Sequence, residues 1–488
     1  MSNDEKAQDF TQVNFAAQLS KLILNDLNNT SNRSSLTIKY TKEQIMTFLD
    51  NPRSSQKQIR NLSEYLYMVS SNYKRLIQYF SGMLRFDYIV EPYNLDITKV
   101  NKETFNKQYF ETIHKLETMN LPHEFTKILK HAFRDDVFYG YEYSGKESYF
   151  IQRLDPDYCK ISSIEDGVYN FSFDFSFFKN IKEVKKYPEE FQDKYTLFKK
   201  DASAYRWQEL DSENTICFKV NEELDFPLPP FTQVFEAIYD IDENKRMRRI
   251  KTKMDNYMIL TQKIPLDEKK GEPNKFLIDL DTAIAFHNKA SESLPEEVGL
   301  ITSPMDIEAI KLERKNNDYD NVAEAERNYY NAAGVSQLLF NGAGSTSTAL
   351  SKSVITDEQI VFMCLQQFER WINRKLKQIG KGKYKFRVRF LETTRFNVQE
   401  VREGFLKAAQ YGMPVKSALA ATLGLTPSNL VSMAFLENEL LDLPNKLIPL
   451  ASSHTSSNKD GAGAPMKSDD DLSESGEKTR DTDGNIRD

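Results

Sequence analysis

The chain has 488 residues, of which 40% are hydrophobic, 12% aromatic and 28% charged, a composition typical of a globular protein with a large core and more than one domain. Its net charge of −7 excludes a basic body that grips nucleic acid through many phosphate contacts. No apolar run approaches the ~20 residues that span a bilayer, and the polar, acidic start lacks a signal-peptide pattern, so we expect no membrane partner. The cysteines Cys159, Cys217 and Cys364 lie far apart without a CxxC pair, which predicts buried thiols and no zinc site.

The first part of the chain is expected to be a flexible arm, residues 1–36, followed by helices. Apolar residues at spacings of three and four predict one amphipathic helix over Gln56–Arg85. Further helices are expected from Lys102 to Met119 and from Pro122 to Phe133.

Strands are predicted next, because apolar and polar residues alternate. The runs that show this pattern are Val137–Tyr149, Ile151–Ile161 and Tyr169–Phe178. The last run places its phenylalanines on one face, namely Phe171, Phe173, Phe175 and Phe177. Asp166-Gly167 supplies a turn before it. The sheet-forming region extends to about Val220, and prolines at 227, 229 and 230 end it.

A long helix is predicted over Phe231–Gln262, because 32 residues pass without proline or glycine; at 1.5 Å per residue its length would be about 50 Å. Its apolar stripe begins with Val234, Ile238 and Ile241. Six basic residues then fall within nine positions, and they are Lys245, Arg246, Arg248, Arg249, Lys251 and Lys253. Six charges so close together cannot all share one face of a helix.

A proline-rich module at 263–305 is expected at the tip of a helical hairpin, whose second helix covers 306–333. The hydroxyl-rich stretch NGAGSTSTALSK follows at 341–352. It lacks the G-x-x-x-x-G-K-[ST] spacing of a phosphate-binding loop, since Lys352 lies eight residues after Gly344.

The remaining folded part is predicted to be mostly helical. Val354–Ile379 is strongly amphipathic, with Thr356 and Gln359 in capping-box spacing. Tyr384–Phe390 alternates as a strand, and Asn397–Leu441 divides into three short helices, the last with a proline at its first position. Residues 451–488 are polar and acidic, which predicts a disordered tail.

No catalytic or metal-binding pattern is recognisable in the sequence. The histidines His114, His123, His131, His287 and His454 show no metal-ligand spacing. Asp135-Asp136 could hold a cation, but an isolated acidic pair at a helix end is usually solvated. No nucleophile elbow or Cys/His dyad can be assigned. We therefore expect no enzyme, no cofactor and no metal.

The order of these parts and several short sequence segments resemble those of the portal proteins of tailed, double-stranded-DNA bacteriophages over roughly residues 50–440. The phrases that carry the resemblance are NLSEYLYMVSSNYKRLIQYFSGMLRFDYIV, FYGYEY, LDPDYCKI and AAGVSQLLFNGAGSTSTALSKSV. The resemblance implies an α+β, predominantly helical fold that forms a ring, normally of twelve subunits, at one capsid vertex. Genomic DNA would be packaged and ejected through this ring. The implied location is the virion, with the host cytoplasm during assembly.

The resemblance also implies a division of the chain into named parts: a wing (37–230 and 354–395), two stem helices (231–262 and 306–333), a clip (263–305), a tunnel loop (334–353) and a crown (396–450). The implied partners are double-stranded DNA, the terminase large subunit, the major capsid or scaffolding protein and a head-completion adaptor. In the clip, the polar candidates for docking are Asp267, Lys269 and Lys270.

On this interpretation the hydroxyl-rich stretch is a mechanical loop that makes transient contacts with DNA phosphates. Its candidate residues are Asn341, Gly342, Gly344, Ser345, Thr346, Ser347, Thr348 and Lys352. A surface connection without a partner is the alternative. The basic residues 245–253 could line the channel or pair with acidic residues across subunits, and we expect pairing for most, with one or two facing the lumen.

Two alternatives from other classes stay open. A nucleotide-dependent enzyme would be stabilised by ATP and magnesium. A monomeric or dimeric nucleic-acid-binding structural module would bind free DNA with a strong salt dependence. A portal protein predicts a closed ring instead.

Overall fold

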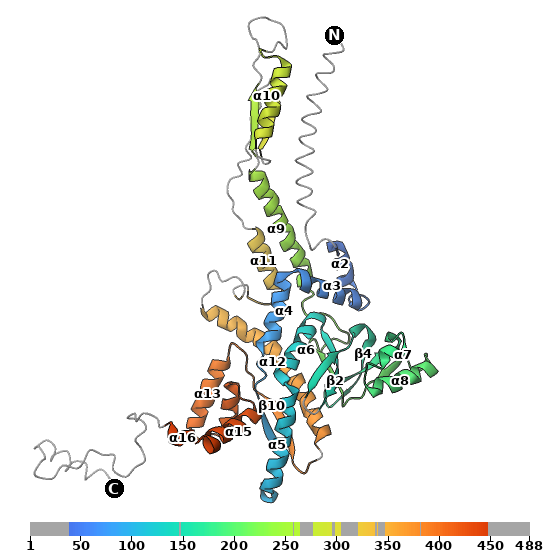
Figure 1. Ribbon diagram of the computed structural model, residues 1–488, viewed down its shortest axis with the longest axis vertical. Helices are drawn as coiled ribbons and strands as arrows, with labels where there is room; N and C mark the ends of the chain where they lie inside the picture. The colour runs from blue at the N-terminus through green and yellow to red at the C-terminus, as the bar shows by residue number, and fades with distance from the viewer. Residues whose placement is uncertain are drawn as a thin grey trace, which may run out of the picture. The chain divides into compact units, whose positions relative to one another are not determined.

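Figure 1 shows a computed structural model of the chain. It describes residues 39–447 except 146–147, 257, 264–276, 295–297, 304–320, 337–338, 340–346 and 381. The chain divides into two units, Met1–Ser428 and Asn429–Asp488, and each is described by itself. The described residues form an α+β protein in which helices predominate and the sheets are small.

The helices of the first half of the first unit are α2 (Lys42–Asp50), α3 (Gln56–Val69), α4 (Ser71–Met83), α5 (Lys102–Met119), α6 (Leu121–Asp135), α7 (Ile181–Val184), α8 (Glu189–Lys200) and α9 (Val234–Asn256). The later helices are α10 (Leu280–Ser293), α11 (Asn321–Ala332), α12 (Ser347–Ile379), α13 (Val398–Gln410), α14 (Lys416–Thr422) and α15 (Pro427–Phe435). The second unit continues with a π-helix (Leu436–Leu440) and α16 (Leu443–Lys446).

The strands form four small sheets. Three of them are antiparallel. The first pairs β1 (Tyr88–Tyr93) with β10 (Lys385–Phe390). The second has the strand order β3 (Tyr149–Arg153), β2 (Val137–Ser144), β7 (Thr215–Lys219), and the third has the strand order β4 (Cys159–Glu165), β5 (Val168–Asp174), β6 (Trp207–Glu209). The fourth pairs β8 (Met258–Lys263) with β9 (Val298–Ser303) in parallel. Because α10 lies between β8 and β9 in the chain, the three elements form a β-α-β unit.

The sheet β3-β2-β7 lies between two hydrophobic cores. Phe138 and Phe218 point into the larger core, where α4, α6 and α12 pack, whereas Tyr139 and Cys217 point into the smaller core with Phe171 and other aromatic residues. Alternate side chains of a strand face opposite sides of the sheet, and β2 is apolar or aromatic from Val137 to Tyr141, where both sides are covered. This sheet thus joins the helical body to the region of β4–β6 and α8.

Several local predictions are confirmed. α5 covers Lys102–Met119 as expected, and Phe171 and Phe173 of β5 are fully buried. The predicted strand Tyr169–Phe178 is too long, because β5 ends at Asp174 and Phe175–Phe177 forms a 3-10 helix in which Phe177 is only half-buried. Asp166 and Gly167 have φ values of +51° and +72°, the left-handed conformation at both positions of a tight hairpin turn. All three cysteines are buried and free.

The helix predicted over Gln56–Arg85 is wrong in one respect, because it breaks at Ser70. The Ser70 N–H donates to the Leu66 carbonyl at 2.8 Å and ends α3. Its hydroxyl accepts the Tyr73 N–H at 3.3 Å and caps α4, a role that serine favours. The break allows Ser63 on α3 to hydrogen-bond the Tyr73 hydroxyl at 2.8 Å.

The helix predicted over Phe231–Gln262 is also shorter than expected. α9 ends at Asn256, and Met258–Lys263 forms β8 instead. Its partner β9 lies about 40 residues further along the chain, so periodicity within the segment cannot reveal the pairing. The sheet-forming region predicted up to about Val220 also contains α8, which packs Phe191 and Tyr195 into the smaller core.

Candidate functional site

The two helices of the predicted hairpin lie side by side in the described part of the chain, as α9 and α11 (Figure 1). The first turns of α9 are anchored in the larger core by Val234, Phe235 and Ile238, all at most 2% exposed. From α11, Tyr329 is fully buried in the same core. The apolar stripe predicted at the start of this helix is therefore confirmed.

The basic residues of α9 follow these anchored turns. Lys245 forms an ion pair with Glu326 of α11, at 3.1 Å between Nζ and Oε1. An acidic partner for this basic segment is therefore available within the same chain, and the pairing expected across subunits stays a prediction. Arg249 and Lys251 are exposed, and Arg246 is half-buried.

The predicted loop residues divide between two regions. Asn341, Gly342, Gly344, Ser345 and Thr346 lie outside the described residues, as do the clip candidates Asp267, Lys269 and Lys270.

Three other loop candidates, Ser347, Thr348 and Lys352, belong to α12, which corrects the predicted loop end at 353. The helix begins early because residues 347–353 contain no glycine or proline to stop it. Thr356 consequently lies inside the helix and donates to the Lys352 carbonyl at 3.3 Å. It is not the capping residue that the sequence predicted.

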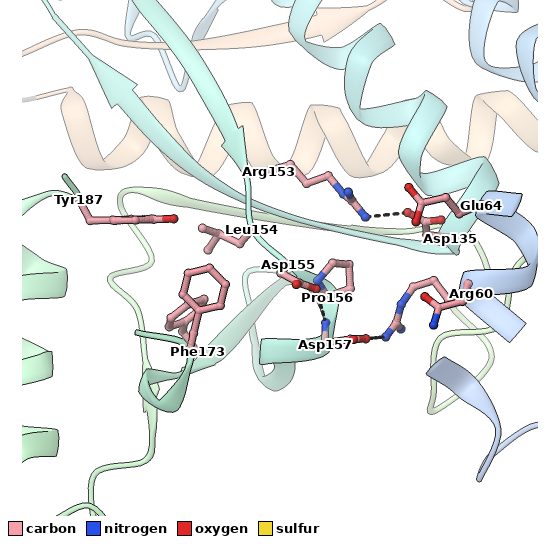
Figure 2. A pocket seen from close by; sticks show the side chains of 12 residues that line it. Arg60, Glu64, Asp135, Arg153, Leu154, Asp155, Pro156, Asp157, Phe173 and Tyr187 are labelled. Atoms are coloured by element: carbon pink, nitrogen blue, oxygen red, sulfur yellow. Dashed lines mark hydrogen bonds and ion pairs between the residues drawn. The ribbon is translucent and has the colours of Figure 1, made fainter. Parts of the chain in front are cut away.

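A charged pocket of about 390 Å³ lies where α3, α6 and β3 meet the segment 154–157 (Figure 2). Figure 2 shows Arg153 pointing at Asp135 and Arg60 pointing at Asp157. Asp135 accepts from Arg134 at 2.8 Å and from Arg153 at 2.9 Å.

Every charged group that makes these contacts has a partner of opposite sign. Arg134 also reaches Glu64 at 3.2 Å, and Asp157 accepts from Lys57 at 2.5 Å as well as from Arg60. Burial alone raises the pKa of Asp157, but the hydrogen bonds from Lys57 and Arg60 outweigh it and lower the pKa. The pocket wall is therefore a network of ion pairs that joins α3, α6 and β3.

This network overturns the expectation that Asp135-Asp136 is solvated. The two residues are only 1% and 0% exposed. Sequence reasoning missed the site because Arg153 lies on β3, eighteen positions further along the chain. The sequence offered one local sign of this site: two adjacent carboxylates stand where the hydrophobic pattern changes from that of a helix to that of a strand.

Two buried cysteines and one buried histidine have pKa values shifted toward their neutral forms. Burial raises the pKa of Cys364 to about 12 and raises that of Cys217 well above its ordinary value, so both thiols stay protonated at neutral pH. Burial also lowers the pKa of His131 to about 4. No group of three or more His, Cys, Asp or Glu in the described residues is arranged to hold a metal ion.

Among the described residues no single helix is long and apolar enough to cross a membrane, although the bent pair Lys416–Thr422 and Pro427–Leu440 meets the criteria of length and composition together.

A second basic segment was not singled out from the sequence. Residues 374–389 contain eight basic residues and no acidic one. Alternation along β10 exposes Lys385, Arg387 and Arg389 on one face. Glu91 of β1 holds both arginines, with contacts at 2.9 Å to Arg387 and 2.8 Å to Arg389.

Similarity to known proteins is low in identity but extends along most of the chain. No protein-family model matches the sequence. The chain is 20% identical over 444 residues to the SPbeta prophage-derived uncharacterized protein YonE of Bacillus subtilis (strain 168), and the match covers 85% of this chain and 84% of that protein.

Two solved structures contain similar chains. One is in the virion of a native gene transfer agent particle, with a TM-score of 0.41, 10% identity, and coverage of 76% of this chain and 94% of that chain. The other is in the neck of an empty gene transfer agent particle, with a TM-score of 0.40, 11% identity, and coverage of 75% and 93%. The chain is thus similar, along most of its length, to a prophage-derived protein.

Proposed function

We propose that this chain is a portal protein of a tailed phage. Copies of it would close into a ring, normally of twelve, at one capsid vertex. The ring would conduct double-stranded DNA during packaging and ejection. It would also dock the terminase large subunit, the capsid or scaffolding protein and a head-completion adaptor.

The observation that carries this proposal is the order of the parts around α9. The order along the chain is α9, whose first turns are anchored in the larger core, then the β-α-β unit of β8, α10 and β9, and then α11, which packs beside α9. This order agrees with the stem, clip and stem that the resemblance implies. The relation to a prophage-derived protein over most of both chains supports a phage origin.

The charge of the chain agrees with a conduit. Each firm Lys or Arg contact with phosphate adds affinity that would slow a moving duplex. The chain is acidic overall, and Lys245 is already paired with Glu326. At least this cation of α9 is therefore neutralised within the chain and would hold a passing duplex only weakly.

The first test is electron microscopy of the purified chain, with its mass in solution measured in parallel. Rings of about a dozen copies with a hole wide enough for duplex DNA are expected. A homogeneous monomer at every salt and protein concentration would refute the proposal, because a head-to-tail interface either closes or grows into filaments.

A second test separates the two roles considered for α9. Charge reversal of Lys245 and Arg248 should impair DNA packaging in assembled particles if these residues act in the lumen. Rings of the purified variant that dissociate under conditions in which rings of the unsubstituted chain stay closed would show that these residues act between subunits instead.

The nucleic-acid-binding module remains a second candidate, favoured by the basic face of β10. Replacing Lys385, Arg387 and Arg389 with glutamine should then weaken binding of free duplex DNA. The substitutions should also flatten the salt dependence, by a slope of about one for each phosphate that is no longer neutralised. An unchanged slope would remove this candidate.

A further inference from the structure

The connection that leads from β7 into α9 is tied together by buried polar groups. Asp136 lies at the junction of α6 and β2 and is fully buried. Its carboxylate accepts the Asn221 N–H at 2.9 Å and the Leu228 N–H at 3.0 Å. One side chain thus holds both ends of the segment 221–228.

Lys219, which is 1% exposed, completes this arrangement from the end of β7. Its ammonium group lies 3.9 Å from Asp136 and donates to the carbonyls of Asn221 and Leu224. The Asn221 side chain also donates to the Leu228 carbonyl at 2.9 Å. Buried charges of this kind are costly unless fully hydrogen-bonded, so the segment depends on this geometry.

The backbone at Asp136 is strained. Its φ of 70° and ψ of −34° lie in a region that residues other than glycine rarely adopt. Such a conformation is energetically costly and persists only where surrounding contacts enforce it. Here the Asp136 N–H donates to Ala132 at 2.7 Å and its carbonyl accepts from Val220 at 2.9 Å.

The same segment contacts α12. The Gln367 side chain donates to the Lys219 carbonyl at 2.7 Å and accepts its N–H at 3.3 Å. Arg370 pairs with Glu222 at 3.1 Å. The first turns of α12 lie within the predicted tunnel loop (334–353), and the segment 221–228 runs into the anchored start of α9.

We propose that Asp136 and Lys219 form a joint that couples α12 mechanically to the entry of α9 through the segment 221–228. A displacement of α12 at Gln367 would reach α9 through this joint. The joint lies within one chain and does not depend on ring formation, although a portal ring would give such a coupling a use in relaying the state of the loop to the stem.

The test is hydrogen exchange of the intact chain, read on peptides covering 221–230 and 231–241, with a peptide of the smaller core (168–178) as reference. Gln367→Ala should raise exchange about tenfold or more in both peptides and leave the reference unchanged. In an Asp136→Asn background, the same substitution should add little, because the joint is already open.

Two further variants keep the test decisive. Lys219→Met should behave like Asp136→Asn and covers the case in which one of them folds poorly. Asp225→Asn is the control, because this residue lies in the same connection but pairs only at the surface with Arg53, where the side chains are 65% and 69% exposed. Additive effects of Gln367→Ala and Asp136→Asn, or a uniform rise that includes the reference peptide, would overturn the proposal.

The pH dependence gives an independent readout. Burial raises the pKa of Asp136 to about 7, so its buried form loses stability relative to an open, solvated one as pH rises from about 4 to 7. The charged or titratable groups that face it are Lys219, Glu223, Tyr139, Cys217 and Cys364. Opening of the segment should increase up to about tenfold per pH unit in this range and level off above it. A flat profile in the unsubstituted chain, or an unaltered one in Asp136→Asn, would contradict the assignment.

Discussion

Replacing Asp135 with alanine should be among the most destabilising single changes in this protein. Its side chain is fully buried and accepts from Arg134 at 2.8 Å through Nε and again through Nη2, and from Arg153 at 2.9 Å. Removing it leaves Arg134 with Glu64 alone, at 3.2 Å. It also removes the ion pair between Asp135 and Arg153. The Nε of Arg153 is already buried without a hydrogen-bond partner among the described residues. Breaking one side of a buried network costs about 3–5 kcal/mol.

The assay is urea unfolding at neutral pH, with the change in free energy taken from the midpoint and the slope. Asp225→Ala is a matched control, because its pair with Arg53 is exposed and such pairs contribute about 0–1 kcal/mol. Both variants should be compared in the same state of assembly, since association shifts apparent stability. A cost below about 1 kcal/mol for Asp135→Ala, or equal costs for the two variants, would refute the view that this network holds the three elements together.

Three other predictions concern packing, pH and the paired helices. Gly140→Ala should destabilise the protein by about 1–3 kcal/mol in thermal or urea unfolding, because a Cβ there would lie 2.6 Å from Ile151. Gly404→Ala is the control: its Cβ would meet nothing within 4 Å, so this variant should be neutral or more stable by up to ~1 kcal/mol. Burial raises the pKa of Asp357 to about 6, so the free energy of unfolding should fall by about 2–3 kcal/mol as pH rises from about 4 to 6. The variant Asp357→Asn should lack this loss, and an equal loss in the variant would show that Asp357 is not its source. Lys245→Glu should cost up to ~1 kcal/mol that a second reversal at Glu326 restores, and failure of the double variant to recover would argue against their pairing.

Local chemistry was sufficient to predict several elements. The helix Lys102–Met119 has its apolar residues, its Asn101 cap and its end within one continuous stretch, so its periodicity gives both bounds. Asp166-Gly167 identifies a hairpin turn because few residue pairs tolerate positive φ at both positions. The long strongly amphipathic α12 was found for the same reason, apart from its early start at Ser347.

What the amino-acid sequence determined by itself about this protein is therefore its local periodicity, its turns, its acidic character and its lack of a recognisable catalytic motif. The tertiary structure alone decided where partners from distant segments meet. β8 is a strand because β9 is available to pair with it, and Asp135 is buried because Arg153 neutralises it from another element. Both outcomes depend on contacts between segments that are far apart in the chain, and a pattern confined to one segment holds no information about such contacts.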